Sequence, residues 1–209
     1  DEHSKTLFLG YSAAALELRK QLDGVGVEVS VTQPLVVYIP CGVGGAPGGI
    51  CFGLKHEFGD NVHVFFAEPT HAPCMTVGLA SGLHDKICVQ DLGIDGITEA
   101  DGLAVSRASG LACEIASRLV AGTFTVSDSE LWEQLAGLSQ AGDSFMEPSC
   151  CAALMGPARL KHHAEASQLL SRGTHVFWAT GGALVPPEER MQMHRKAQDA
   201  LKAAMLSTG

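Results

Sequence analysis

The hydrophobic residues of the chain form two kinds of pattern: short continuous runs, and longer stretches in which apolar positions recur every three or four residues. Three continuous runs stand out, at residues 35–39, 62–67 and 174–179. Short runs that are apolar throughout are typical of strands buried on both faces of a parallel sheet. A shorter run at 123–126 predicts a fourth strand.

Helical periodicity fills most of the intervening chain. Leu7, Tyr11, Ala14 and Leu18 recur at helical spacing and predict a helix over residues 4–23. Ser127 stands where an N-cap residue is expected, ahead of a helix that reaches about residue 141. The other predicted helices cover 48–58, 72–82, 98–121, 149–155, 157–172 and 187–206, and residues 86–91 are expected to be extended.

Strands and helices therefore alternate along the chain. This alternation predicts an α/β fold, with an open, mostly parallel sheet and helices on both faces. The 209 residues are 46% hydrophobic, which is enough for a substantial core. The sequence contains no internal repeat, low-complexity segment or obvious linker, so we expect one domain.

Composition excludes two classes of partner. The formal net charge is −9 and no basic stripe is present, which argues against nucleic acid. No apolar run approaches 18 residues, so we expect no membrane span. The seven cysteines are odd in number and lack a Cys-x-x-Cys pair, which favours buried, reduced thiols in a cytoplasmic protein. Neither the Cys150-Cys151 nor the His162-His163 doublet has the spacing of a zinc site.

A glycine-rich loop follows the first apolar run, with the sequence Cys41-Gly42-Val43-Gly44-Gly45-Ala46-Pro47-Gly48-Gly49. Glycines let backbone N–H groups turn toward an anion, and the N-terminus of the next helix adds free donors and the positive end of its dipole. The sequence therefore predicts a loop that binds a single compact phosphate mainly through its backbone. A tight strand–helix turn without a ligand is the alternative.

Two familiar phosphate loops do not match this segment. No Lys follows Gly48 or Gly49 as a Walker loop requires. Pro47 stands where the last glycine of a dinucleotide fingerprint is expected. A nucleotide-binding Rossmann domain nevertheless remains open, because Glu68 lies near the position of the acidic ribose ligand.

A second glycine-rich turn, Thr180-Gly181-Gly182-Ala183, follows the run at 174–179. Open α/β sheets bind ligands at the carboxyl ends of their strands, and a Thr hydroxyl can form a hydrogen bond with a ring nitrogen. The turn Glu147-Pro148-Ser149 precedes a helix and is a candidate to lie beside the other two. Each of these turns, taken alone, also fits an ordinary strand end or helix cap.

Six segments, which together span nearly the whole chain, carry a resemblance: Thr6–Tyr11, Pro40–Gly49, Phe65–His71, Gly82–Asp85, Ala100–Val105 and Trp178–Gly182. They resemble the bacterial D-serine dehydratases (D-serine ammonia-lyases). It implies the tryptophan-synthase-like fold of pyridoxal-phosphate enzymes (fold type II). It also implies conversion of D-serine to pyruvate and ammonia by β-elimination, with pyridoxal 5'-phosphate as cofactor. Residues 1–209 would form the C-terminal part of the cofactor-binding domain.

The resemblance also assigns roles to residues. It gives the cofactor phosphate to the backbone of Gly42, Val43, Gly44, Gly45 and Ala46, and the pyridine nitrogen to Thr180. A neutral hydroxyl at that nitrogen leaves it largely unprotonated, which suits β-elimination. Wider relatives bind a cation near the segment that matches residues 68–74. Glu68 is interpreted first as a structural hydrogen-bonding residue, with cation binding as the alternative, so the metal stays open.

The chain departs from the family pattern in two ways. Ala46 and Ala183 stand where the family usually has Gly, and a positive φ at residue 46 would cost about 1 kcal/mol. No lysine lies in a Ser-x-Lys segment like the one that carries the family's cofactor-linked lysine. We therefore expect that the N-terminal region with this lysine is absent, that the chain has no catalytic residue and is inactive alone, and that a complementary N-terminal fragment is its partner. A non-catalytic module that binds pyridoxal phosphate or another small phosphate is the alternative.

Overall fold

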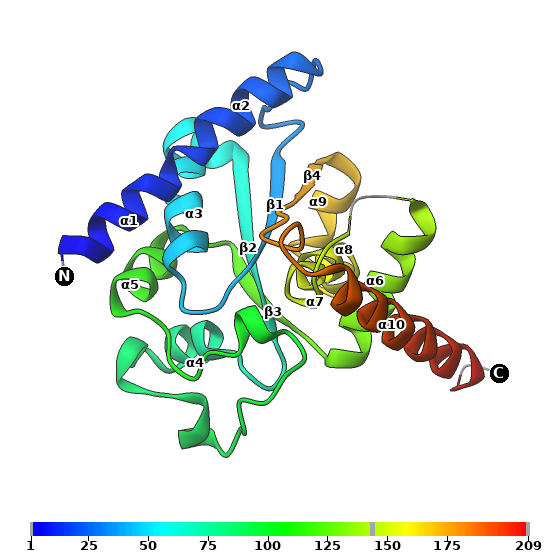
Figure 1. Cartoon of the computed structure of the whole chain (residues 1–209). Coiled ribbons are helices and arrows are strands. Elements are labelled where there is room, and N and C mark those ends of the chain that lie inside the picture. Colours follow the sequence, from blue (N-terminus) through cyan, green and yellow to red (C-terminus); the bar gives the residue numbers. More distant parts are fainter. Residues whose placement is uncertain (1, 143–144, 208–209) are drawn as a thin grey trace.

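A four-stranded parallel sheet forms the centre of the molecule, as the alternation of elements predicts (Figure 1). The computed structural model describes residues 2–142 and 145–207. The strands are β1 (Leu35–Pro40), β2 (Val62–Pro69), β3 (Gly122–Val126) and β4 (Thr174–Phe177), in the spatial order β3-β2-β1-β4. All neighbouring strands pair in parallel, so their carboxyl ends meet at one edge of the sheet.

Helices cover both faces of this sheet (Figure 1). On one side lie α1 (Glu2–Ser12), α2 (Ala14–Gly24), α3 (Gly45–Phe58), α4 (Cys74–Ser81) and α5 (Gly110–Leu119). On the other lie α6 (Asp128–Ala141), α7 (Pro148–Cys151), α8 (Gly156–Leu160), α9 (Ser167–Arg172) and α10 (Pro187–Ser207). In the described part of the chain, 3-10 turns lie between these elements at Gly59–Asn61, His84–Lys86, Val89–Leu92, Asp101–Leu103 and Ala152–Met155.

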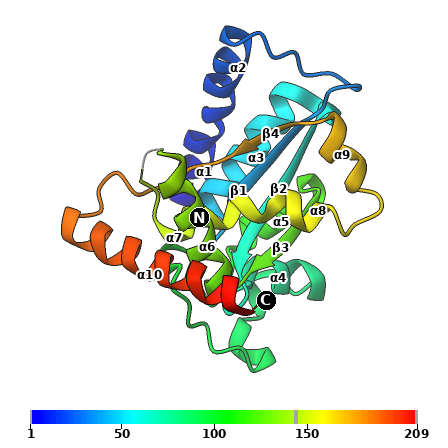
Figure 2. The same cartoon turned by 90° about the vertical axis from the view of Figure 1, so that its right-hand side faces the viewer.

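The longest helix, α10, packs along α6 on the side of the molecule that faces the viewer in Figure 2. Ala197 of α10 is fully buried against this neighbour. Within residues 2–142 and 145–207, no helix combines the length and the apolar character needed to cross a membrane.

Strand β1 sends its side chains into two separate cores. Leu35, Val37 and Ile39 point into the core shared with α2 to α5, whereas Val36 and Tyr38 point into the core shared with α8 and α9. Every residue of β1 is buried, because both faces of a parallel sheet are covered by helices. This is the physical reason that the sequence of the strand is a continuous apolar run.

Helices α1 and α3 approach each other so closely that two glycines are needed between them. A Cβ added at Gly49 or at Gly53 would overlap the backbone carbonyl of Phe8 or of Ser12, respectively. The helix predicted over 4–23 is divided beside this contact. Ser12 Oγ donates to Leu9 O (2.7 Å), and Ala13 N donates to Gly10 O rather than to Leu9 O, which separates α1 from α2.

The long helix predicted over 98–121 is wrong. Only Gly110–Leu119 is α-helical, and a 3-10 turn and irregular backbone precede it. Thr98 Oγ1 donates to Asp128, and Gly102 N donates to Ser149 Oγ, so tertiary partners take the polar groups that a helix would use. Ser109 Oγ caps α5 by accepting from Ala112 N.

Two further predictions need correction. Residues 86–91 are not an extended strand, because 3-10 turns occupy His84–Lys86 and Val89–Leu92, the second held by Asp91 accepting from Cys88 N. The helix predicted over 157–172 is two helices, α8 and α9, separated by residues 161–166. The strands and the remaining helices lie where the sequence places them, within a few residues.

Candidate functional site

Both glycine-rich turns leave the same edge of the sheet. Strands β1 and β4 are parallel neighbours, with Tyr38 opposite Phe177, and the turns begin directly after them. Parallel strands lie about 4.8 Å apart, so the two turns start side by side. We call residues 42–46 the first loop and residues 180–182 the second turn.

The carbonyl groups of the first loop are tied to the protein. Val43 O accepts a hydrogen bond from Ser109 N (2.8 Å), and Gly44 O accepts one from Gly48 N (2.9 Å). In a planar trans peptide the N–H points opposite to the C=O. Anchoring these two carbonyls therefore turns the N–H groups of Gly44 and Gly45 the other way.

The N–H groups of the first loop have no acceptor within residues 2–142 and 145–207. This holds for each residue from Gly42 to Ala46. They stand at the N-terminus of α3, a helix of 14 residues, where the dipole is positive. Five unpaired donors around one turn fit a compact anion such as phosphate.

Gly44 is the residue on which the shape of this loop depends. Its φ is +100°, a conformation that L side chains rarely adopt. A Cβ there would lie 2.5 Å from Met75 Cε and 2.7 Å from Ala112 Cβ. Ala46, by contrast, lies in α3 without a positive φ, so the strain considered for that position from sequence does not arise.

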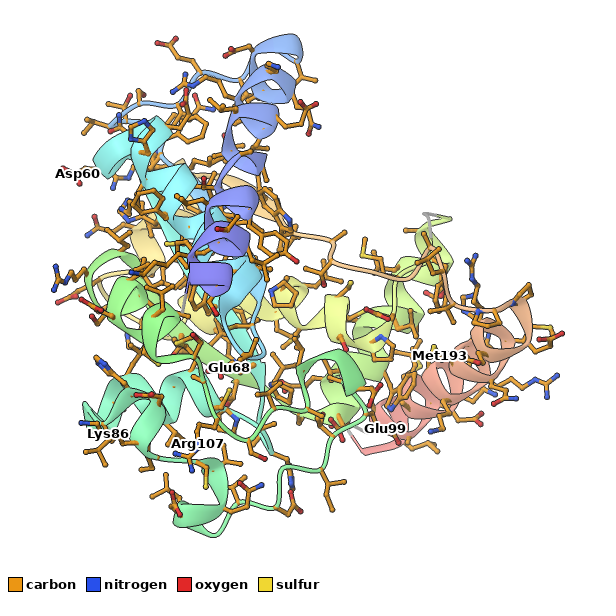
Figure 3. All side chains as sticks on the ribbon, turned by 60° about the vertical axis from the view of Figure 1, so that its left-hand side comes forward. Asp60, Glu68, Lys86, Glu99, Arg107 and Met193 are labelled. Carbon is orange, nitrogen blue, oxygen red and sulfur yellow. The ribbon has the colours of Figure 1, made fainter. Side chains whose placement is uncertain are left out.

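Glu68 holds the start of α4, where Met75 lies beside Gly44 of the first loop. It is fully buried at the end of β2, in the interior of the molecule (Figure 3). One carboxylate oxygen accepts from Met75 N (2.7 Å), and the other accepts from Thr76 N (2.8 Å) and Thr76 Oγ1 (2.5 Å). Burial raises the pKa of Glu68 to about 7, although the hydrogen bonds from Thr76 and Met75 lower it.

These contacts give Glu68 the structural role that the sequence favours, since its oxygens satisfy the first amides of α4. In the part of the chain that the structure describes, no three His, Cys, Asp or Glu side chains are placed to hold a metal ion. All seven cysteines are free thiols, and six of them are buried.

The second turn is organised around a sulfur atom. Cys150 Sγ accepts from Thr180 N (3.1 Å) and from Gly181 N (2.8 Å), and it lies 3.1 Å from Thr180 Oγ1. Cys150 is almost inaccessible to solvent. The Glu147 carboxylate packs against Gly181 so closely that a Cβ there would overlap it. The amides of Thr180 and Gly181 are therefore occupied, and Thr180 itself is exposed, with its hydroxyl beside the sulfur.

The turn Glu147-Pro148-Ser149 joins the two regions, as its sequence suggested. Ser149 Oγ accepts from Gly102 N (3.1 Å), and the Gly102 backbone packs against Gly42 of the first loop. The 3-10 turn that replaces part of the predicted long helix thus fills the space between the first loop and α7. Sequence reasoning missed the contacts of Cys150, because it interpreted this residue as a buried thiol and tested its doublet with Cys151 only against the spacing of a zinc site.

The chain is similar to a known family and to several curated proteins. A family model described as pyridoxal-phosphate dependent enzyme matches residues 2–181. A probable D-serine dehydratase of Aeromonas hydrophila is 54% identical over 196 residues, which is 90% of this chain and 44% of the relative. One from Bacillus subtilis is 49% identical over 207 residues, 97% of this chain and 46% of the relative. The chain thus spans less than half the length of these curated relatives.

Solved structures show the same fold. A threonine deaminase from T.th. superposes with a TM-score of 0.65 at 25% identity, covering 85% of this chain and 59% of that protein. A fungal L-serine ammonia-lyase from Rhizomucor miehei gives a TM-score of 0.69 at 20% identity, covering 91% and 56%. Both are longer than the chain and share its parallel sheet with helices on the two faces.

Proposed function

Because the chain belongs to the family of pyridoxal-phosphate dependent enzymes, we propose that it is part of a D-serine ammonia-lyase, which converts D-serine to pyruvate and ammonia. The curated relatives named probable D-serine dehydratase match it at about half of its positions over 90% or more of its length. They support this substrate above those of the structural neighbours, whose identity is far lower.

The family's cofactor is pyridoxal 5'-phosphate, and the first loop is the observation that carries the proposal. The phosphate group is a compact dianion, and the amides of Gly42 to Ala46 offer it five unpaired donors at a helix N-terminus. When bound, the cofactor supplies an electron sink for the charge that develops on the substrate's Cα during β-elimination.

The second turn supports the same ligand. A molecule with a phosphate at one end and a ring nitrogen at the other can touch both turns, since they leave adjacent strands. In our proposal the Thr180 hydroxyl forms a hydrogen bond with the ring nitrogen. A hydroxyl does not hold a proton on that nitrogen as a carboxylate would, which leaves a milder electron sink that is sufficient for loss of the β-hydroxyl.

The covalent attachment of the cofactor requires a residue outside these turns. No lysine of the chain lies in a Ser-x-Lys segment, and Lys55 is engaged at the opposite end of β2, where it donates to Val62 O (2.7 Å). We infer that the attachment lysine belongs to the part of the relatives that this chain does not span. The chain alone is then inactive and requires a complementary N-terminal fragment.

Complementation tests the proposal directly. The chain is mixed with a separately produced N-terminal half of the Bacillus subtilis relative, pyridoxal phosphate and D-serine, and pyruvate is measured. We expect pyruvate from the mixture and none from either part. A chain that carries Gly44→Ala is the matched negative control. Absence of pyruvate at every ratio, with both parts folded, argues against the lyase.

The second candidate is a non-catalytic module that binds pyridoxal phosphate or another small phosphate. The complete first loop in a chain without the attachment lysine favours it. Titration with pyridoxal phosphate, with inorganic phosphate as competitor, separates the candidates: binding without complementation supports the module. A rise in melting temperature with a dinucleotide, and none with pyridoxal phosphate, would instead support a nucleotide-binding domain.

A further inference from the structure

Two buried thiols lie behind the first loop and face one of its carbonyl groups. Cys74 Sγ donates to Gly42 O at 3.3 Å, and Cys41 Sγ donates to the same oxygen at 3.6 Å. The exposed fractions of the two side chains are 1% and 0%. Gly42 O is thus directed into the protein interior by two donors from different parts of the chain, the residue that follows β1 and the first residue of α4.

The direction of this carbonyl fixes the direction of an amide. Gly42 C=O and Val43 N–H belong to one planar trans peptide, so they point in opposite directions. With the carbonyl held against the thiols, Val43 N–H points away from the interior. The Val43 side chain is 51% exposed, which places this residue at the accessible side of the loop. The next carbonyl, Val43 O, is held by Ser109 N in the same manner.

Both thiols retain the proton that such a contact requires. Burial raises the pKa of Cys74 to about 12 and that of Cys41 well above its usual range, and the nearby Glu68 carboxylate raises both further. A thiolate would repel the carbonyl oxygen, whereas a neutral thiol donates to it. Cys74 is in turn held in place, because the amides that follow it in α4 donate to Glu68.

We propose that Cys74, assisted by Cys41, is a positioning residue for phosphate binding: its thiol holds the Gly42 carbonyl inward and thereby presents Val43 N–H to the anion. This inference rests on the proposed function, since it assumes that the first loop binds phosphate. It adds residues that touch neither the phosphate nor the ring, and it connects Glu68, α4 and the loop in one chain of contacts.

Substitutions at Cys74 test the inference with a control of similar size. Cys74→Ala removes the donor, and Cys74→Ser retains a donor at the same position. Cys51→Ala is the matched control, because Cys51 is equally buried and lies within α3, away from the two thiols that donate to Gly42 O. The probes are inorganic phosphate and pyridoxal phosphate. The readouts are their dissociation constants, the carbonyl ¹³C shift of Gly42 and the amide shift of Val43 by NMR.

We expect Cys74→Ala to weaken phosphate binding about threefold to tenfold, as loss of one modest hydrogen bond does, and to move both NMR signals before phosphate is added. The dissociation constants of Cys74→Ser should lie within about twofold of those of the unmodified chain, and those of Cys51→Ala should equal them. Should Cys74→Ala fail to fold, Cys41→Ala provides the second variant, with the same NMR signals moving by a smaller amount.

The failures of the two proposals are distinguishable. An unmodified chain that binds neither phosphate nor pyridoxal phosphate overturns the proposed function. An unmodified chain that binds them, together with a Cys74→Ala variant that binds equally well, overturns only the positioning role. Equal weakening by Cys74→Ala and Cys51→Ala, with the Gly42 signal unmoved, likewise overturns it, because the thiol would then only fill space.

Discussion

The first loop and the second turn follow adjacent strands, yet the protein organises them in opposite ways. In the first loop, neighbouring groups hold the carbonyls, and the amides are left unpaired among the described residues. In the second turn, a side-chain sulfur accepts from the amides of Thr180 and Gly181 and also contacts the hydroxyl of Thr180, an exposed residue. The first arrangement offers positive ends of dipoles to an anion, and the second offers one neutral hydroxyl.

The strands beneath the two regions differ as well. β1 is buried along its whole length between β2 and β4, whereas β4 lies at one edge of the sheet and is only partly buried. A fully buried central strand holds the start of its loop in a fixed position, so the loop can orient several amides at once. A turn on an edge strand needs local support, which Cys150 and Glu147 supply. Four predictions test this contrast.

Gly44→Ala should have the largest effect, since it disfavours the backbone conformation of the first loop. The positive φ costs about 1–2 kcal/mol and the overlap with Met75 and Ala112 about 1–3 kcal/mol more. We expect the free energy of unfolding in urea to fall by about 2–5 kcal/mol and phosphate binding to be lost. Gly45→Ala is the control, because an added Cβ there meets no atom within 4 Å. Equal behaviour of the two variants would falsify the importance assigned to Gly44.

Glu68→Gln should have the second-largest effect, and it should change how the free energy of unfolding depends on pH. The pKa of Glu68 is raised to about 7 in the folded chain, against an ordinary value of 4.5. The folded state therefore binds the proton more tightly, so this carboxyl stabilises the fold most below pH 4.5, and that contribution is lost as pH rises through about 7. The variant should lack this slope.

Above pH 7 the free energy of unfolding of the same variant should be about 1–3 kcal/mol lower than that of the unmodified chain, because one amide of α4 loses its acceptor. The neighbouring thiols of Cys41, Cys74 and Cys113 stay neutral across this range, since burial raises the pKa of each. Urea unfolding between pH 4.5 and 8 measures both effects. An unchanged slope in the variant would show that Glu68 is not the group responsible.

Cys150→Ala addresses the support of the second turn. Two backbone amides lose their acceptor, but the turn is partly accessible and water can replace the sulfur. We therefore expect a loss of about 1 kcal/mol in unfolding free energy and faster amide hydrogen exchange at Gly181. Cys151→Ala is the control, because this residue lies next to Cys150 in the same helix and packs into the core instead. Comparable exchange at Gly181 in both variants would contradict the role of the sulfur.

Thr180→Val should have the smallest effect, because it removes one neutral hydroxyl. If that hydroxyl binds the ring nitrogen, the affinity for pyridoxal phosphate should fall about threefold to tenfold and the absorbance of the bound cofactor should change. Thr180→Ser should preserve both. The affinity for inorganic phosphate, which has no ring, should be unaffected by either change, and a loss there would point to a general disturbance of this edge.

The sequence predicts the sheet well and the segment between residues 98 and 109 poorly. β1 and β2 are recognisable because burial on both faces demands continuous apolar side chains. The irregular segment before α5 is not, since Thr98 and Gly102 bind residues 30 and 47 positions away. Hydrogen bonds to such distant residues produce no periodic pattern in the sequence. The composition of the segment, which is typical of a helix, therefore predicts the wrong structure.

The same reasoning separates the two parts of the candidate site. Glycine density and position after a strand predict the first loop as an anion site, and the phosphate titrations test that prediction. The supporting thiols of Cys41, Cys74 and Cys150 are not predictable, because a buried cysteine that packs and a buried cysteine that donates to a carbonyl have the same sequence pattern. Which carbonyl or amide each sulfur contacts is decided by the folded structure.

The contact between α1 and α3 has a consequence for how the chain tolerates change. At Gly49 and Gly53 the two helices touch backbone to backbone, so their spacing is that of bare main chains. A larger residue at either position would push α3 away from α1 and change the orientation of α3. Because the first turn of α3 carries amides of the first loop, a substitution along this helix contact would also change the directions in which those amides point.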